Sequence, residues 1–295
     1  MSNDCHITFW GTRGSIPTPG RLTEKYGGNT TCVVVRQGNT VIIFDAGSGI
    51  RPFGGSLAKE LAKGSGIERL HLFFTHTHWD HIQGLPFFIP AFLDNVEINI
   101  YSSPDKAPLL KDILNGQMSF TYFPIEMSSF AAKLHYHSLP TEPMTLGEMS
   151  ISWELHPFHP GGSVRYCVEV NNRKFIFATD AELDPLFADG RLSPEQKKER
   201  TDYLKFVEGA HVLVADGQYL NEDYIGKVGW GHSSMGAAIK VAEEAGVHRL
   251  ALFHHEPAYS DSTLDRMQKE TQQACAEKKS KLEAFWAREA MTIAL

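Results

Sequence analysis

The feature that most constrains this chain is a cluster of histidine and aspartate side chains directly after an apolar segment. Residues 69–76, RLHLFFTH, have the character of a buried strand, and T-H-T-H-W-D-H-I-Q-G occupies residues 75–84. A backbone that leaves a strand can fold four side chains around one point: His76, His78, Asp80 and His81. Imidazole and carboxylate groups together suit Zn²⁺, Mn²⁺ or Fe²⁺. Four such ligands are too many for one tetrahedral ion with an open position, so the spacing predicts two divalent cations that share the loop.

The rest of the chain alternates between strand signals and helix signals. Short runs rich in β-branched, aromatic or other apolar residues predict strands at 5–11, 31–38, 40–47, 69–76, 96–102, 149–158, 163–170, 174–180, 211–217 and 249–255. Helices are expected at 56–63, 106–114, 193–208, 233 or 234 to 244, and 262–287. Strands dominate each half, which favours two mixed sheets facing each other with helices outside. Because no repeat, low-complexity tract or long linker interrupts the pattern, residues 1–295 are interpreted as a single domain.

Charge and cysteine usage narrow the function classes. The chain has 28 basic and 35 acidic residues, a net charge of −7, which disfavours a broad nucleic-acid surface. The four cysteines form no CxxC pair and are expected to be reduced, buried thiols of a cytoplasmic protein. The start shows no secretory signal, and the apolar stretch 84–93 is too short for a membrane span.

Further candidate ligands stand at the ends of later predicted strands. His156 and His159 lie in H-P-F-H-P-G-G, and His254 and His255 end RLALFHH. Asp180 ends KFIFATD, while Asp45 and Asp216 end two other strands. Strand ends on one edge of a sheet are where loops gather into a site, so each of these residues is a candidate. His135, His137, His211 and His248 have no such context.

The order H-x-H-x-D-H, then His, Asp and His, resembles the metallo-β-lactamase superfamily over almost the whole chain. The resemblance is closest to its ribonuclease Z and phosphoribosyl cyclic phosphodiesterase branch. It is carried by F-W-G-T-R-G-S-I-P-T, Y-G-G-N-T-T-C, F-D-A-G-S-G, G-H-S-S-M-G-A-A and E-E-A-G-V-H-R-L-A-L-F-H. It implies an α+β fold, a four-layer αββα sandwich with a dinuclear metal site between the two sheets.

The resemblance also implies a ligand set. The first metal would be held by His76, His78 and His159, the second by Asp80, His81 and His254, and Asp180 would bridge both. His159 is preferred to His156 because it directly precedes the Pro-Gly-Gly turn, and His254 is preferred to His255 because it directly follows the strand. Asp180 is preferred to Asp45 and Asp216 as the bridge because it falls between the two histidines in the expected order, and Asp45 is interpreted as a supporting carboxylate.

These residues predict a hydrolytic mechanism. Two ions sharing a water lower its pKa toward neutrality, and the resulting hydroxide would attack phosphorus or a carbonyl carbon. Asp180 would fix the pair of ions, and Asp80 would orient the attacking hydroxide. His232, in G-W-G-H-S-S, is the candidate general acid that the resembled branch uses, and the alternative is that it caps the helix that follows.

A small, cyclic phosphodiester such as a cyclic nucleotide is the expected substrate. The segment 182–214 is short and has no Gly-Pro-rich arm for transfer RNA, and the net charge is acidic, so an extended nucleic acid is an unlikely partner. Candidate substrate contacts are Asn29, Arg13 and Lys227 for a phosphate, and Tyr219 and Trp230 for stacking on a base. No membrane partner is expected, and the segment 84–93 could line a homodimer interface or be buried within one subunit.

Four alternatives remain beside this interpretation. The first is a ribonuclease Z-like RNA endonuclease, and the second is hydrolysis of a carboxylic ester, thioester or lactone on the same metal site. The third is a di-iron oxidoreductase, although no flavin-binding segment is visible. The fourth is a metal-binding sensor module that is not an enzyme.

Overall fold

Two seven-stranded sheets face each other in the computed structural model, which describes residues 4–187, 191–277 and 280–295. In the first sheet the order is β14 (Thr292–Ala294), β1 (Cys5–Gly11), β2 (Cys32–Gln37), β3 (Thr40–Phe44), β4 (Arg69–Phe73), β5 (Glu97–Ser102) and β6 (Lys133–Ser138). In the second it is β13 (Glu283–Trp286), β12 (Arg249–Phe253), β11 (Val212–Asp216), β10 (Arg173–Ala178), β9 (Ser163–Val170), β8 (Met149–His156) and β7 (Met144–Leu146).

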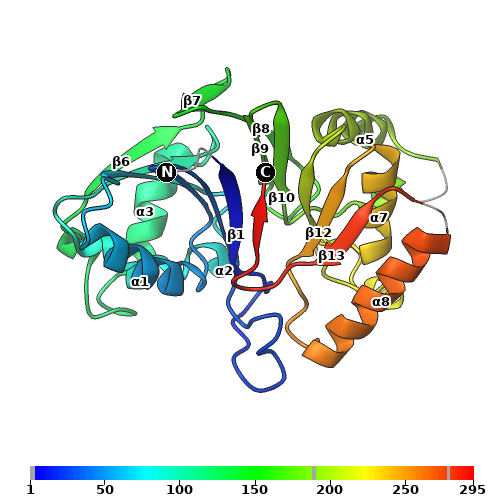
Figure 1. Ribbon diagram of the computed structural model, residues 1–295, viewed down its shortest axis with the longest axis horizontal. Helices are drawn as coiled ribbons and strands as arrows, with labels where there is room; N and C mark the ends of the chain where they lie inside the picture. Colours follow the sequence, from blue (N-terminus) through cyan, green and yellow to red (C-terminus); the bar gives the residue numbers. More distant parts are fainter. Residues whose placement is uncertain (1–3, 188–190, 278–279) are drawn as a thin grey trace.

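Helices cover the outer face of each sheet (Figure 1). On the first sheet lie α1 (Ile50–Leu61), α3 (Ala107–Gln117) and the short turns α2 (Trp79–Ile82), η1 (Leu85–Phe87), η2 (Ile89–Phe92) and η3 (Met127–Ser129). On the second lie α4 (Asp184–Phe187), α5 (Pro194–Val207), α6 (Asn221–Tyr224), α7 (Met235–Glu244) and α8 (Asp261–Glu277). Ser193 and Gln196 form a reciprocal cap that begins α5, and Ser234 caps α7 by accepting from the Ala237 amide.

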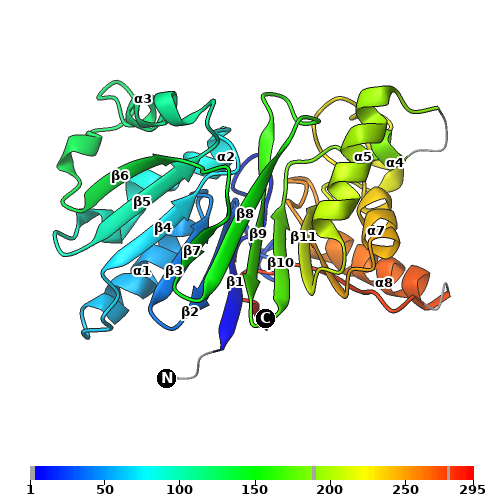
Figure 2. The ribbon, with the colours of Figure 1, turned by 90° about the horizontal axis from the view of Figure 1, so that it is seen from above.

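Three apolar layers hold the sandwich together. The inner layer between the sheets is rich in aromatic rings, among them Phe44, Phe73, Tyr166 and Phe177, and each outer layer packs helices onto a sheet. Burying this much apolar surface is the main stabilising contribution to the fold. The view from above shows the resulting order of layers, helix, sheet, sheet, helix (Figure 2), and this confirms the α+β sandwich.

Parallel pairing brings the important loops to one edge. The strands β3, β4, β5 and β6 are parallel neighbours, and so are β10, β11, β12 and β13. The carboxyl ends of parallel strands meet at the same edge of a sheet, which is where loops build sites in such folds. The segments after β4, β10, β11 and β12 therefore lie together.

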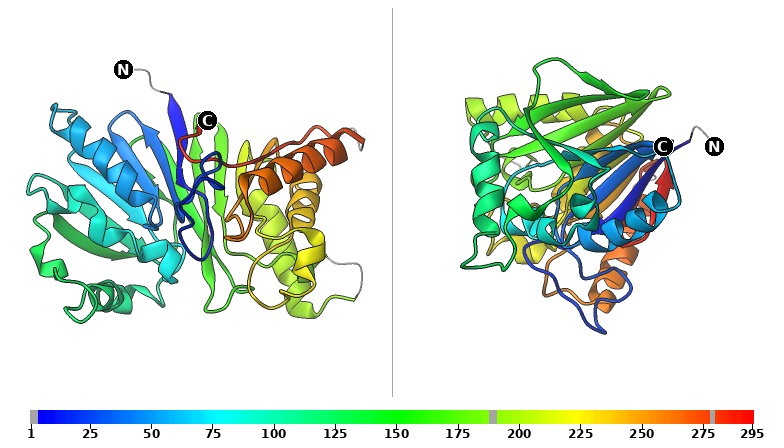
Figure 3. Two further views of the ribbon diagram at one scale, coloured as in Figure 1. Left: turned by 90° about the horizontal axis from the view of Figure 1, so that it is seen from below. Right: turned by 90° about the vertical axis from the view of Figure 1, so that its left-hand side faces the viewer.

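The end of the chain differs from the sequence prediction. A single helix at 262–287 is wrong, because α8 ends at Glu277 and residues 278–279 lie outside the described part. Residues 283–286 instead form β13, which pairs in parallel with β12. The last strand, β14, pairs antiparallel with β1, so that Leu295 lies beside Cys5 at the start of β1 (Figure 3). Edge strands gain their hydrogen bonds from neighbours distant in sequence, so local helix propensity does not decide their structure.

Other differences are smaller. The helix expected at 56–63 begins at Ile50, and the strands at Lys133–Ser138 and Met144–Leu146 were not predicted. In the segment 84–93, Leu85, Phe88 and Ala91 are buried under α1, whereas Phe87, Ile89 and Phe92 are exposed. The homodimer therefore stays a prediction. No helix in the described part of the chain has the length and apolar character that spanning a bilayer requires.

Candidate metal centre

Side chains from both sheets converge where the loops meet. Among the described residues, three groups made only of expected ligands have ligand atoms that all lie within 4.8 Å of one another: His76, His78 and His159; Asp80, His81 and His254; and His76, His81 and Asp180. A fourth group with the same spacing contains Asp180, His254, Asp216 and His232. In the first group, His159 Nε2 lies 3.1 Å from His78 Nδ1. In the second, His254 Nε2 lies 3.1 Å from Asp80 Oδ2. The structure thus brings together all seven side chains expected as ligands.

Asp180 lies between the first two groups. Its Oδ2 is 3.3 Å from His81 Nε2, and its Oδ1 is 3.4 Å from His254 Nε2 and 3.7 Å from His76 Nε2. One carboxylate that faces imidazoles of both groups has the placement required of a bridging ligand.

Two observations test whether this cluster fits cations. The Nε2 atoms of His76 and His81 are buried and have no hydrogen-bond partner, although carboxylate oxygens lie nearby. Such unsatisfied buried nitrogens are costly unless something binds them. Imidazole and carboxylate groups are also the donors that Zn²⁺ and related ions prefer. The residues present therefore fit a pair of divalent cations.

The electrostatics of the cluster favour positive charge at this place. Burial alone would lower the pKa of His254, but the Asp180 and Asp80 carboxylates raise it to about 9. Burial would raise the pKa of Asp80, yet the neighbouring His81 and His254 imidazoles lower it well below its usual range. The carboxylates thus stabilise whatever cation lies between them.

Three of the imidazoles, those of His81, His159 and His254, are oriented through their second nitrogen. His81 Nδ1 donates to Asp45 at 2.8 Å, and His159 Nδ1 donates to the Gly231 carbonyl at 2.9 Å. His254 Nδ1 lies 3.2 Å from Gln218 Oε1. These contacts fix the tautomer and leave the other nitrogen free for a cation. Asp45 therefore has the supporting position expected of it.

Three strand-end residues adopt a left-handed backbone conformation. Asp45, Asp180 and His254 have φ values of 61°, 55° and 61°, which are uncommon for residues with side chains. Each follows a parallel strand and turns its side chain toward the centre. Local strain of this kind persists only where the surrounding structure enforces it, and it is concentrated at functional sites.

His232 lies beside the cluster and is held by a buried carboxylate. Its Nδ1 donates to Asp216 Oδ2 at 2.7 Å, its ring stacks on His254 at 4.7 Å, and its side chain is 12% exposed. Ser234, not His232, caps α7. Asp216 is therefore the hydrogen-bond partner of His232, and its Oδ2 also lies 4.0 Å from His254 Nδ1.

The competing histidines are engaged elsewhere. His156 Nδ1 lies 2.9 Å from Glu199, and His255 Nε2 donates to the Ala287 carbonyl at 2.7 Å. Neither residue belongs to any of the ligand groups in the described chain.

The predicted substrate contacts are mixed. Arg13 is fully buried and donates to the Gly27, Glu256 and Tyr259 carbonyls, so a phosphate contact is wrong for this residue. Tyr219 is only 2% exposed and offers no free face for a base, so that prediction is also wrong. Asn29 donates to Glu289, whereas Trp230 is 58% exposed with Lys227 Nζ 4.0 Å from its ring centre.

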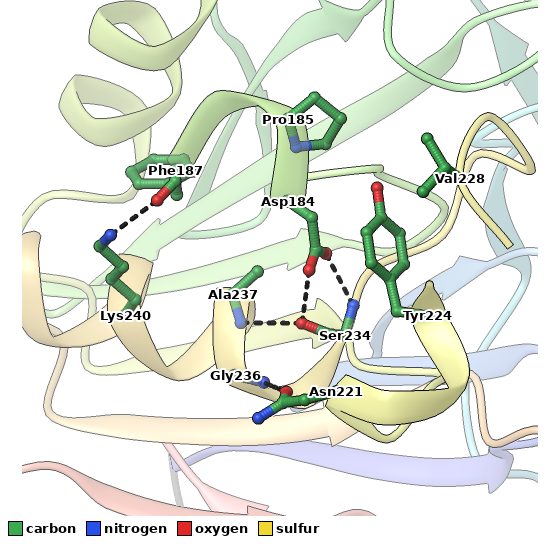
Figure 4. Close-up of a pocket in the computed structure, with 10 residues that line it drawn as sticks. All are labelled: Asp184, Pro185, Phe187, Asn221, Tyr224, Val228, Ser234, Gly236, Ala237 and Lys240. Carbon is green, nitrogen blue, oxygen red and sulfur yellow. Dashed lines mark hydrogen bonds between the residues drawn. The ribbon is translucent and has the colours of Figure 1, made fainter. Parts of the chain in front are cut away.

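Several residues near the site were missed. Gln218, Thr75 and Glu182 support the imidazoles or their loops, and Trp79, between two candidate ligands, is 73% exposed. The roles of Gln218, Thr75 and Glu182 depend on contacts between distant segments, which the sequence does not show. The position of Trp79 within H-W-D-H did indicate that this side chain lies at the site. A pocket of about 290 Å³ adjoins the site and is lined by His76, Lys106 and Gly162. Another, of about 510 Å³, is lined by Asp184 and Tyr224 and by none of the candidate ligands (Figure 4).

Comparison with known proteins agrees with this fold. The family model described as beta-lactamase superfamily domain matches residues 40–255. Ribonuclease Z of Thermoplasma acidophilum is 24% identical and that of Picrophilus torridus 26% identical, each with 90% of both chains covered. Among solved structures, unliganded yeast PDE1 has a TM-score of 0.69 at 17% identity, covering all of both chains. Human tRNase Z, short form, has a TM-score of 0.59 at 19% identity, covering 98% of each.

Proposed function

This chain belongs to the beta-lactamase superfamily, and from that premise we propose that it is a divalent-metal-dependent phosphodiesterase. The observation that carries the proposal is the set of seven convergent side chains with the His232–Asp216 pair beside it. The relatives named ribonuclease Z and PDE1 support phosphodiesters as the substrate class.

The proposed ligands follow the three groups. His76, His78 and His159 would hold one cation, Asp80, His81 and His254 the other, and Asp180 would contact both. Zn²⁺ suits a group of three imidazoles best, and Mn²⁺ or Fe²⁺ are the alternatives. When bound, such ions acidify water and neutralise charge on the phosphate oxygens.

The protein's own residues supply positioning and a proton. Asp80 is fixed by the Ser15 amide, which donates to its Oδ2 at 2.7 Å, so this carboxylate is placed to orient the attacking group. The Nδ1–H group of His232 donates a hydrogen bond to Asp216. The other ring nitrogen, Nε2, is then the one that would donate a proton to the leaving oxygen. The Asp216 carboxylate stabilises the protonated imidazole, as in other His–Asp pairs.

A small, cyclic phosphodiester is the favoured substrate. The net charge of −7 does not suit a long polyanion, and α5 packs against the second sheet instead of projecting as an arm (Figure 2). Residues 188–190 of the expected short segment lie outside the described part. Lys227 and Trp230, together at the exposed edge of the site, and Asn29 remain the proposed substrate contacts.

RNA cleavage is the second candidate. It is favoured by the ribonuclease Z relatives, which match about nine-tenths of the chain. We further propose a cytoplasmic location, because the buried thiols of Cys5, Cys32 and Cys167 suit a reducing compartment.

A substrate panel at matched metal loading tests these assignments. It contains a cyclic nucleotide, a bis-aryl phosphodiester, a precursor transfer RNA with a 3′ extension, and a lactone. Hydrolysis of the cyclic nucleotide at a higher kcat/KM than RNA supports the favoured substrate, and the reverse order supports RNA. Hydrolysis of the lactone and of no phosphodiester would overturn the proposed phosphodiesterase activity. Bound metal without turnover of any substrate would instead indicate a sensor module.

A further inference from the structure

Glu182, two residues beyond Asp180, has a buried carboxylate that no step of the proposed reaction uses. Glu182 is 6% exposed. Its carboxylate accepts three hydrogen bonds, all from residues 224–231. Oε1 accepts from the Tyr224 hydroxyl and from the Gly229 amide, each at 2.7 Å, and Oε2 accepts from the Gly231 amide at 3.0 Å. A buried charge is tolerated when such donors surround it, and these bonds are stronger than neutral ones.

The same residue also contacts the other side of His159. The Glu182 amide donates to the Phe158 carbonyl at 3.1 Å, directly before His159 in the chain. The Gly231 carbonyl, in turn, accepts from His159 Nδ1 at 2.9 Å. His159 is therefore fixed from both directions by groups that Glu182 holds.

The Gly231 backbone lies too close to His159 for any side chain. Its φ is +86°, and a Cβ atom there would lie 2.3 Å from Pro160 Cδ and 2.5 Å from His159 Nδ1. The preceding residues, 221–230, are mostly exposed, and a pocket lies behind Tyr224 and Val228 (Figure 4). Because so little of this segment is packed, the hydrogen bonds to Glu182 account for the fixed position of Gly231.

We propose that Glu182 is a positioning residue that acts through Gly231 to hold His159 as a metal ligand. The Gly231 carbonyl accepts a hydrogen bond from His159 Nδ1 and so holds the ring proton on that nitrogen. The other nitrogen, Nε2, then faces His78 Nδ1, which lies 3.1 Å away and would bind the same cation. Partners that orient ligating histidines set metal affinity. The inference rests on the proposed metal-dependent function.

The test compares Glu182→Gln with Tyr224→Phe. A glutamine keeps the shape but points its NH₂ donors at one of the two glycine amides, which then loses its acceptor. We expect whichever of the Gly229 and Gly231 amides loses its acceptor to exchange hydrogen at least about tenfold faster, with β10 and α7 unchanged. Competition with a chelator for Zn²⁺ should show affinity about 10- to 100-fold weaker. Tyr224→Phe removes only the hydroxyl donor and should stay within about twofold on both measurements.

Each result decides the proposal. Unchanged Zn²⁺ affinity in Glu182→Gln, or faster exchange throughout the chain, would overturn it. If that variant does not fold, the wild-type chain still decides, because the Gly229 and Gly231 amides must exchange more slowly than the other amides of 221–232. None of these measurements uses a substrate, so a wild-type protein without phosphodiesterase activity would refute the proposed function and leave this positioning role to be judged separately.

Discussion

At the scale of single residues, the centre depends on what lies behind each imidazole. A carboxylate, a backbone carbonyl or an amide oxygen holds the second nitrogen of His81, His159 and His254. His232 is held in the same way by Asp216. Because the tautomer of each ring is fixed, His81, His159 and His254 can act as metal ligands while the neighbouring His232 acts as a proton donor.

Replacing His232 with alanine separates proton donation from metal binding. We expect His232→Ala to keep the metal content of the wild type and to lose about 10²–10⁴-fold in kcat on alkyl phosphodiesters. Aryl diesters, whose leaving groups need no proton, should be affected far less. His248→Ala, at an exposed histidine directly before β12, is the control. Equal losses on both substrate types would contradict the general-acid role.

The sequence predicted those residues whose spacing is itself a chemical signal. The H-x-H-x-D-H motif and the strand-end His159, Asp180 and His254 are adjacent to the elements that place them. Glu182 and Gln218 could not be predicted, because their partners lie 36 to 49 residues away and only the folded loops bring them together. Arg13 was misjudged for the same reason, since its carbonyl partners come from two distant loops.

At the scale of elements, strand order decides where the site forms. The parallel strands of both sheets carry their loops to one edge, and most of them were predictable from apolar runs. The strands β6, β7, β13 and β14 were not, because each lies in the outer part of a sheet and is short or rich in polar residues. Such strands are stabilised by pairing rather than by local preference.

The C-terminal strand should contribute measurably to stability. Ile293 in β14 is 4% exposed, packs in the inner layer and pairs with Ile7 of β1. Ile293→Ala should lower the free energy of unfolding by about 3 kcal/mol, because it removes buried methyl groups and leaves a cavity. Ala294→Ser, at an exposed position, should change it by less than about 0.5 kcal/mol. Denaturant titration measures both, and equal stabilities would show that β14 is not part of the cooperative fold.

A buried ion pair ties α5 to the second sheet and gives a pH dependence. Glu199 accepts from Arg165 Nη1 at 2.6 Å and from His156 at 2.9 Å, and Arg165 also pairs with Glu154. Burial would raise the pKa of Glu199, but His156 and Arg165 lower it below its ordinary 4.5. A carboxyl whose pKa is lower in the folded state stabilises the fold above pH 4.5, and this contribution is lost as pH falls through the lowered value.

Glu199→Gln should therefore destabilise the protein most near neutral pH. We expect a loss of about 3 kcal/mol at pH 7, since Arg165 is left with one partner, and a smaller difference from wild type below pH 4.5. Glu154→Gln, which removes the exposed partner of the same arginine, should cost less than about 1 kcal/mol. A difference between wild type and Glu199→Gln that grows on acidification would contradict the assigned direction.

At the scale of the whole molecule, the centre joins the two halves of the sandwich. His76, His78, Asp80 and His81 follow a strand of the first sheet, and His159, Asp180 and His254 follow strands of the second. Ligands that bind only the folded state stabilise it, so bound metal should hold the two sheets together.

Chelation should consequently lower thermal stability. A cation present at about 100 times its dissociation constant adds about 2.7 kcal/mol, which corresponds to a Tm roughly 4 °C higher in a chain of this size. Scanning calorimetry with and without EDTA measures the difference, and restoring Zn²⁺ should restore the Tm. Asp180→Asn should show a much smaller response to EDTA. An EDTA effect of the same size in this variant would argue against a centre shared by the two sheets.

The most direct test of the account is the metal content of the purified protein. Elemental analysis after metal-replete purification should find about two divalent cations per chain in the wild type and clearly fewer in His254→Ala. His255→Ala, the neighbouring buried histidine outside the ligand groups, should keep the wild-type content if it folds. A wild-type chain that carries fewer than about one cation would contradict the central claim.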